Sequence, residues 1–282
     1  MNKLPFSYQK AIIVLFVFII IIAVSACGLR EEKTPEQWFS FTWSGLAGCD
    51  SLSFQGLAAL QRGDEAAKKE NISYTGRLNN HRELSIQTVI PQNTSSGRVR
   101  TAEAGAFSKS KFKLRWERGG WRLQSDENDM MVRGLTRLNP LHQLEEIKGT
   151  SKTITAESGA ARGTKVLRIV LNPSESTLRM KDRLLEEMSS LEIGLENKLQ
   201  KVDASRRDVV AKEITTLWTA GNAKLQQMLE HMNANVVYHL TIDRKTGLPA
   251  RLTSETIVDY VTSQGASQRE VLYTDTRFDG YR

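Results

Sequence analysis

Apolar residues recur along the chain with two different periods, and each change of period marks a predicted element. Over residues 52–90 they alternate with polar or small residues, as in β-strands that bury one face. The turn pair Asn79-Asn80 and the later Pro91 divide this region into an antiparallel meander of three strands. By the same alternation, residues 112–123 are predicted to form a hairpin that turns at Gly119-Gly120.

Alternating residues return in the second half of the chain, on both sides of a long helical segment. Lys152–Ala156 and Thr164–Leu171 are predicted as two strands joined by a glycine-containing turn. Residues 236–242, 251–260 and 269–278 then predict three further strands, which make a second meander.

Helical spacing predicts a long hairpin over residues 174–233, interrupted at 203–207. Its two apolar stripes are expected to pack on each other or on the sheet rather than to form an exposed binding face. Shorter helices are predicted after the capping signals Thr34-Pro35 and Asn139-Pro140. The stripe residues are Leu184, Met188, Leu191, Leu195, Leu199 and Val202, then Val210, Ile214, Leu217, Gly221, Leu225, Met228 and Met232.

These elements predict an α+β fold for residues 35–282. A curved antiparallel sheet, a half-barrel, is covered by helices because a sheet with one apolar face must bury it. The 174–233 hairpin is inserted between two strands and is expected to help cover that face. An imperfect cover would leave an apolar pocket, whereas a complete one would leave a filled core.

The first 28 residues have the composition of a secretory signal peptide. Lys3 and Lys10 give a positive start, residues 11–23 are apolar, and small residues follow. The ending Val24-Ser25-Ala26-Cys27 resembles the lipobox of bacterial lipoproteins. That resemblance implies a signal peptide over 1–26, a diacylglyceryl thioether on Cys27, and a lipidated tether over 27–34. The protein would then be anchored to the cell membrane by lipid, on its extracytoplasmic face.

A retained transmembrane helix is the alternative for the same stretch. A membrane-spanning helix needs about 20 apolar residues, and the apolar run over 11–26 is shorter. Small residues before a cysteine suit a peptidase and are not required in a membrane helix. Either interpretation puts the remaining chain outside the cytoplasm.

Charge and cysteine content narrow the class further. The chain carries 39 Lys+Arg against 32 Asp+Glu, and removing Lys3 and Lys10 would lower its net charge from +7 to about +5. This excess suits a surface near anionic lipid or cell-wall polymer and does not predict nucleic-acid binding.

The two cysteines are Cys27 and Cys49. If Cys27 is acylated, Cys49 has no partner and is expected to be a small buried apolar residue.

One strand of the predicted 112–123 hairpin has a basic outer face. Four cations alternate with apolar residues there, so they share one side of the sheet. A solvated face is the simpler interpretation; a patch for lipid headgroups or anionic wall polymer is the functional one. The residues are Lys109, Lys111, Lys113 and Arg115.

The sequence contains no catalytic signature. The four histidines lack zinc-site spacing, and no nucleophile elbow, phosphate-binding loop or dinucleotide-binding motif is present. We therefore predict a non-enzymatic protein without a metal or other cofactor. The five tryptophans, Trp38, Trp43, Trp116, Trp121 and Trp218, could line a groove for sugar or lipid, although large aromatic residues more often fill cores.

The stretch over residues 240–251, especially 243–249, resembles the strand–turn–strand of the LolA/LolB-like lipoprotein-carrier superfamily. The order of elements from Trp38 to Phe278 is also similar to that superfamily. The resemblance implies a curved sheet wrapped around helices, with an apolar cavity for acyl chains. The 174–233 hairpin is much longer than the lid helices of the family, so it is either an extended lid or an insertion with its own partner.

The leading hypothesis is a lipid-anchored extracytoplasmic protein that binds or carries a lipid-like ligand. The alternative is an interaction or sensor lipoprotein whose hairpin docks on a membrane or on an envelope protein, and an envelope hydrolase is less favoured. No nucleic-acid partner is expected. The ligand is expected to contact four candidate residues, Leu184, Leu191, Trp218 and Leu225.

Overall fold

The computed structural model describes residues 33–63, 69–91, 107–124, 130–200 and 202–282. The predicted signal peptide, Cys27 and most of the tether lie outside these ranges. Within them, no helix combines the length and the apolarity needed to cross a bilayer. The helices are α2 (Pro35–Ala47), α3 (Met130–Leu135), the 3₁₀ turn η1 (Thr136–Leu138), α4 (Pro140–Gly149), α5 (Pro173–Leu199) and α6 (Ala204–Glu230).

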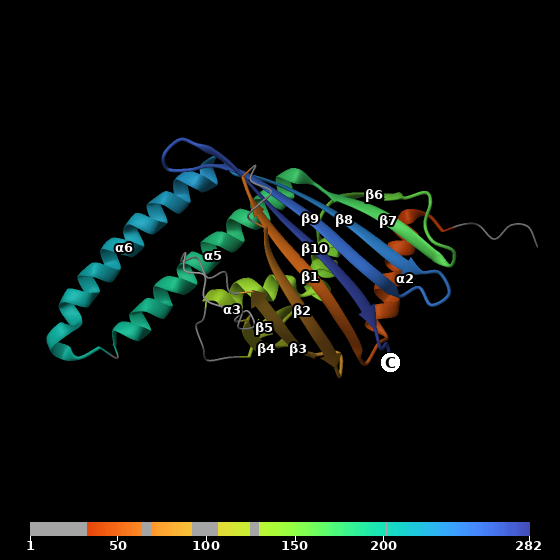
Figure 1. The fold of residues 1–282 in the computed structure, drawn as a ribbon, viewed down its shortest axis with the longest axis horizontal. Coiled ribbons are helices and arrows are strands. Elements are labelled where there is room, and N and C mark those ends of the chain that lie inside the picture. Colours follow the sequence, from red (N-terminus) through yellow and green to blue (C-terminus); the bar gives the residue numbers. More distant parts are fainter. Residues whose placement is uncertain (1–32, 64–68, 92–106, 125–129, 201) are drawn as a thin grey trace, which may run out of the picture.

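Ten antiparallel strands form one open sheet in the order β5-β4-β3-β2-β1-β10-β9-β8-β7-β6 (Figure 1). The two predicted meanders are confirmed, and they join because the first and last strands pair, with Phe54 opposite Phe278. The strands are β1 (Leu52–Arg62), β2 (Lys69–Asn79), β3 (Glu83–Pro91), β4 (Phe107–Glu117), β5 (Gly120–Leu123), β6 (Lys152–Ala156), β7 (Thr164–Leu171), β8 (Asn233–Asp243), β9 (Pro249–Val261) and β10 (Ser267–Asp279).

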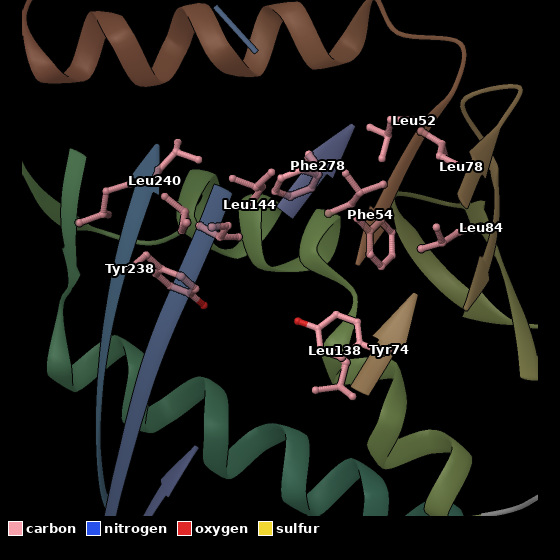
Figure 2. Close-up of a cluster of buried hydrophobic side chains, with 14 of the residues drawn as sticks. Leu52, Phe54, Tyr74, Leu78, Leu84, Leu138, Leu144, Tyr238, Leu240 and Phe278 are labelled. Atoms are coloured by element: carbon pink, nitrogen blue, oxygen red, sulfur yellow. The ribbon is translucent and has the colours of Figure 1, made fainter. Parts of the chain in front are cut away.

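The alternation of apolar residues puts one set of side chains on a single face of the sheet. On β8, Val236, Tyr238 and Leu240 are buried, and the residues between them are partly exposed. The buried face packs against α2 and α4. On α4, Leu144 and Ile147 are almost fully buried. Figure 2 shows core side chains from both halves of the sheet, with Tyr238 and Leu240 on one side and Phe54, Tyr74 and Leu84 on the other. The predicted α+β architecture with one helix-covered sheet is therefore present.

Two glycines let aromatic rings lie flat on the buried face. A Cβ atom at Gly76 would lie 2.1 Å from the Phe54 ring, and one at Gly56 would lie 2.5 Å from the Tyr74 ring. Each glycine is directly opposite its aromatic partner across β1 and β2. The Tyr74 hydroxyl, held there, hydrogen-bonds with the Thr276 hydroxyl at 2.6 Å. Burial raises the pKa of Tyr74 to about 12.

The predicted helical hairpin is present as α5 and α6, between β7 and β8 in the chain. Its base is attached to the body: Arg179 Nη2 donates to the Gly149 carbonyl at 2.6 Å, and Arg137 pairs with Glu187 at 2.5 Å. Most of the hairpin extends away from the sheet (Figure 1). The expectation that it lies over the apolar face is not met along this length, because α2 and α4 already pack against that face.

Candidate ligand pocket

An apolar cavity of about 240 Å³ opens between α2, α4 and the ends of β1, β2, β4 and β5. An engineered apolar cavity of about 150 Å³ is enough to hold benzene, so this one is large enough for a hydrocarbon segment. Its lining is mainly apolar and includes three of the five tryptophans. The lining residues are Trp43, Leu46, Ala47, Cys49, Leu52, Leu78, His81, Trp116, Trp121, Leu141, Leu144 and Glu145.

Helix α2 forms the first wall. A capping box starts it: Gln37 N donates to Thr34 Oγ1 at 3.2 Å, and Thr34 N donates to Gln37 Oε1 at 2.8 Å. Trp38 and Phe39 are buried on one face, and Trp43 lines the cavity. Ala47 is the last residue of α2; its side chain is exposed and lines the rim of the cavity.

The β4–β5 hairpin supplies the second wall through a tryptophan pair. Trp116 and Trp121 are directly opposite each other, with ring centroids 5.4 Å apart in an edge-to-face arrangement. The tight turn between them needs positive φ at Arg118 and Gly119, which is why the sequence has glycine there. Trp121 Nε1 donates to Glu145 Oε1 on α4 at 3.1 Å, which fixes its ring.

Helix α4 closes the pocket and carries its few polar groups. Asn139 caps the helix by accepting a hydrogen bond from Leu141 N at 3.0 Å, and Leu144 points into the core. His142 Nδ1 lies 3.7 Å from Glu145 Oε2, so the carboxylate has two nitrogen neighbours. His81, which also lines the cavity, contacts the Asp50 carboxylate through Nε2.

Cys49 is buried in the pocket wall, as the sequence predicted. Its Sγ donates to the Gly45 carbonyl at 3.3 Å. Burial, and to a smaller degree the nearby Asp50 carboxylate, raises the pKa of the Cys49 thiol. The residue is therefore a neutral thiol at pH 7, and a nucleophilic thiolate is disfavoured.

A second, more polar cavity of about 200 Å³ adjoins the first, and Trp121 lines both. Arg133, Thr136 and His142 contribute polar atoms to it. Asn139 is completely buried, and its side-chain NH₂ has no hydrogen-bond partner in the described part of the chain. This side chain offers an unused donor beside the cavity.

The four predicted ligand contacts lie on the hairpin, and none of them lines either cavity. Met188 lies 3.8 Å from a Cβ atom built at Gly221, and this antiparallel register puts Leu184 level with Leu225 and Leu191 level with Trp218. All four side chains are half-buried. The prediction was wrong for Leu217, which is 74% exposed; the adjacent Trp218 takes the seam position instead.

The four basic residues of β4 share one side of the sheet, as the alternation predicted. Lys109, Lys111, Lys113 and Arg115 are exposed on one face of β4, and Phe112 and Leu114 are buried on the other. Within the described ranges, no group of three or more His, Cys, Asp or Glu side chains could hold a metal ion.

Sequence reasoning considered tryptophans as a possible groove but did not select Trp43, Trp116 and Trp121. These residues come from three elements that are distant in the chain, and only the tertiary fold brings them together. The local signal for a site was the Trp116–Trp121 pair on either side of a two-residue turn. Helix α3 and η1, which line the second cavity, were not predicted.

No protein-family model matches the chain, and no curated protein matches its sequence. Among solved structures, one of lipovitellin is similar, with 7% identity and a TM-score of 0.37; the match covers 82% of this chain and a quarter (25%) of the lipovitellin chain.

Two bacterial structures are also similar in fold. One is a domain from Vibrio parahaemolyticus whose name assigns it to outer membrane lipoprotein sorting, with 10% identity, a TM-score of 0.24, and coverage of 87% of this chain and 93% of that one. The other is a LolA superfamily protein from Nitrosomonas europaea, with 8% identity, a TM-score of 0.23, and coverage of 87% and 94%. None of these similarities assigns the chain to a family.

Proposed function

We propose that this chain is a non-catalytic protein that binds or carries a lipid-like amphiphile. It acts outside the cytoplasm, where acyl chains on Cys27 anchor it to the membrane. The apolar cavity between α2, α4 and the β4–β5 hairpin holds a hydrocarbon segment of the ligand, and the adjoining cavity holds its polar group.

The observation that carries this proposal is the pairing of two unlike cavities around Trp121. The first is lined mainly by apolar side chains, with His81 and Glu145 among them. The second has Arg133, Thr136, Asn139 and His142 beside Leu114, Trp121 and Leu123. An amphiphile has the same division into an apolar and a polar part. Each methylene that leaves water for the first cavity contributes about 0.8 kcal/mol, so a short segment of acyl chain gives useful affinity.

Uptake of a fluorescent fatty acid by residues 28–282 tests this proposal. All described helices and strands lie within Pro35–Asp279, and the sheet shares one core with α2 and α4, so this chain contains the whole described fold without its anchor. Ala47→Trp adds a large side chain at the cavity rim without removing a core residue. It is expected to weaken uptake about tenfold or more.

Ala220→Trp is the matched control, because Ala220 is also exposed on a helix but lies on α6, away from both cavities. It should bind the fatty acid as the unaltered chain does. Equal binding by both variants, with circular dichroism showing intact folds, would refute the pocket as the ligand site.

A second candidate function is docking through the hairpin, and one observation favours it. Ile193, Val209 and Leu217 are 56%, 65% and 74% exposed, and all three lie on α5 or α6. If docking is the main function, residues 28–282 take up no fatty acid or phospholipid, and Val209→Glu/Leu217→Glu releases the same chain from purified envelope membranes.

A further inference from the structure

Strand β4 presents a row of cations on the face of the sheet opposite the pocket. Lys109, Lys111, Lys113 and Arg115, called here the basic row, are all exposed. Alternate residues of an antiparallel strand are about 7 Å apart, so the basic row is about 20 Å long. The side chains between them face the interior, where Phe112 and Leu114 are 4% and 2% exposed.

The three lysines of the basic row have no acidic neighbour across the ladder. Ser85, Gln87 and Val89 of β3 lie directly opposite Lys113, Lys111 and Lys109. On the described part of this face, Glu83 pairs with Arg115 at 3.0 Å, and Glu117 lies beyond Arg115 on the same face of β4, at the end of the row away from the lysines. Three successive outward positions therefore carry positive charge with no acidic partner among the described residues.

Neighbouring strands add to this charge. Arg115 is directly opposite Arg122 of β5, and like charges in this position destabilise a strand pair. Arg77 of β2 pairs with Ser85, which in turn pairs with Lys113, so a further cation lies two strands from the row. The arrangement costs stability, and packing of the sheet gives no reason for it.

Two arginines elsewhere on the same face are neutralised by aspartates. On β9 and β10, Arg251 makes two hydrogen bonds to Asp275, at 2.7 and 2.6 Å, and Arg269 donates to Asp259 at 2.7 Å. These two arginines of β9 and β10 thus have acidic partners, whereas the three lysines of the basic row have none among the described residues. This difference indicates an anionic partner from outside the fold for the basic row.

We propose that the basic row docks on the surface of an anionic phospholipid bilayer. Lysine ammonium groups are compact, mobile point charges, which suit a layer of phosphate headgroups. Single-stranded nucleic acid would need aromatic side chains beside the cations, but the aromatic residue within the row, Phe112, lies on the buried face. Because Leu114 and Trp116 of the same strand line the two cavities, docking brings the ligand site close to the bilayer.

Vesicle flotation with residues 28–282 tests the proposal without the acyl anchor. The unaltered chain should bind vesicles that contain phosphatidylglycerol more tightly than vesicles of phosphatidylcholine alone. Each lysine near such a surface contributes roughly a factor of five, so Lys109→Gln/Lys111→Gln/Lys113→Gln should weaken binding about a hundredfold at low salt. Raising the salt from 0.1 to 1 M should remove most of the difference, since the screening length falls from about 10 to about 3 Å.

Lys212→Gln/Lys224→Gln/Lys245→Gln is the matched control, because it removes the same charge from exposed lysines on α6 and on the β8–β9 turn. It should bind like the unaltered chain. The proposal is overturned if both triple variants lose binding equally, if the unaltered chain does not prefer anionic vesicles, or if it binds a soluble polyphosphate and not the vesicles. Fatty-acid uptake should be unchanged in both triple variants, so this test is separate from that of the pocket.

Discussion

The sheet body and the α5–α6 hairpin bury their apolar side chains to very different depths. In the body, Ile86, Ile147 and Leu240 are fully buried. Along the hairpin, every described apolar side chain from residue 177 to 228 keeps part of its surface exposed, and Leu217 is 74% exposed. Apolar residues recur regularly in both regions, with period two in the strands and helical spacing in the hairpin, so periodicity alone does not reveal how deeply an apolar stripe is buried.

This difference teaches where binding can occur in each region. The body has a closed core with a defined cavity, which suits a small apolar ligand. The hairpin has a seam that only two helices share, which suits a partner that adds further surface. The predictions below use the contrast, beginning with the largest expected effect.

Replacing one leucine by alanine in each region should give the largest difference in the free energy of unfolding. Leu240→Ala should lower the free energy of unfolding by about 3 kcal/mol, because it leaves a cavity in a closed core. Leu217→Ala should change it by less than about 0.5 kcal/mol, since the side chain is mostly in water. Urea unfolding measures both. Similar losses would show that the hairpin is as tightly packed as the body.

Charging the hairpin seam separates the two regions in function. Leu191→Glu/Leu225→Glu should destabilise the hairpin by about 1–3 kcal/mol, because both half-buried side chains lose their apolar contacts. Amide exchange should accelerate in α5 and α6 and stay unchanged in β8 and β9. Fatty-acid uptake should also remain unchanged. A folded variant that loses uptake would instead make Leu191 or Leu225 part of the ligand site.

A buried hydroxyl pair in the body gives a smaller effect. Tyr74→Phe removes the 2.6 Å hydrogen bond and leaves Thr276 without that partner, which should cost about 1–2 kcal/mol. The raised pKa of Tyr74, about 12, means that its contribution is complete below pH 10. As the pH rises from about 10 to 12, the unfolded tyrosine ionises first and this stability is lost.

Comparing urea midpoints at pH 8 and pH 11 isolates this contribution. The unaltered protein should lose more stability between the two values than Tyr74→Phe does. An equal loss would mean that Tyr74 ionises in the folded protein at its ordinary pKa.

The smallest effect is expected on the exposed face of the body. Hydrogen bonds from Arg251 hold the pKa of Asp275 below its usual range. Its stabilisation is therefore present above the ordinary carboxyl pKa and is lost as the pH falls through the lowered value. Because both side chains are partly exposed, Arg251→Gln should cost less than about 1 kcal/mol at pH 7 and almost nothing in strong acid. A constant difference at both pH values would contradict this explanation.

Most of the secondary structure could be predicted because each strand alternates and each turn has its own chemistry. Asn80 and His81 adopt positive φ beside the predicted Asn79-Asn80 turn, and Asn139 caps the predicted short helix. Helix α3 has only six residues, too few to show a helical period. Leu217 and Trp218 are adjacent apolar residues that both fit a spacing of three or four, so the sequence did not separate them.

The pocket could not be predicted for a different reason. Trp43 and Trp116 line the same cavity only because the tertiary fold brings α2 and the β4–β5 hairpin to it from distant parts of the chain. A single sequence contains no signal for that arrangement. The basic row, in contrast, lies on one strand, and strict alternation was enough to place it on one face.

Native mass spectrometry of residues 28–282 tests the central claim most directly, because the claim is that the body, without an anchor, holds a lipid. The unaltered chain should carry an extra mass that organic extraction removes and identifies as a lipid. Ala47→Trp should show little of this mass, and Leu191→Glu/Leu225→Glu should retain it. A bare protein mass for all three, with no uptake of added phospholipid or fatty acid, would contradict the account.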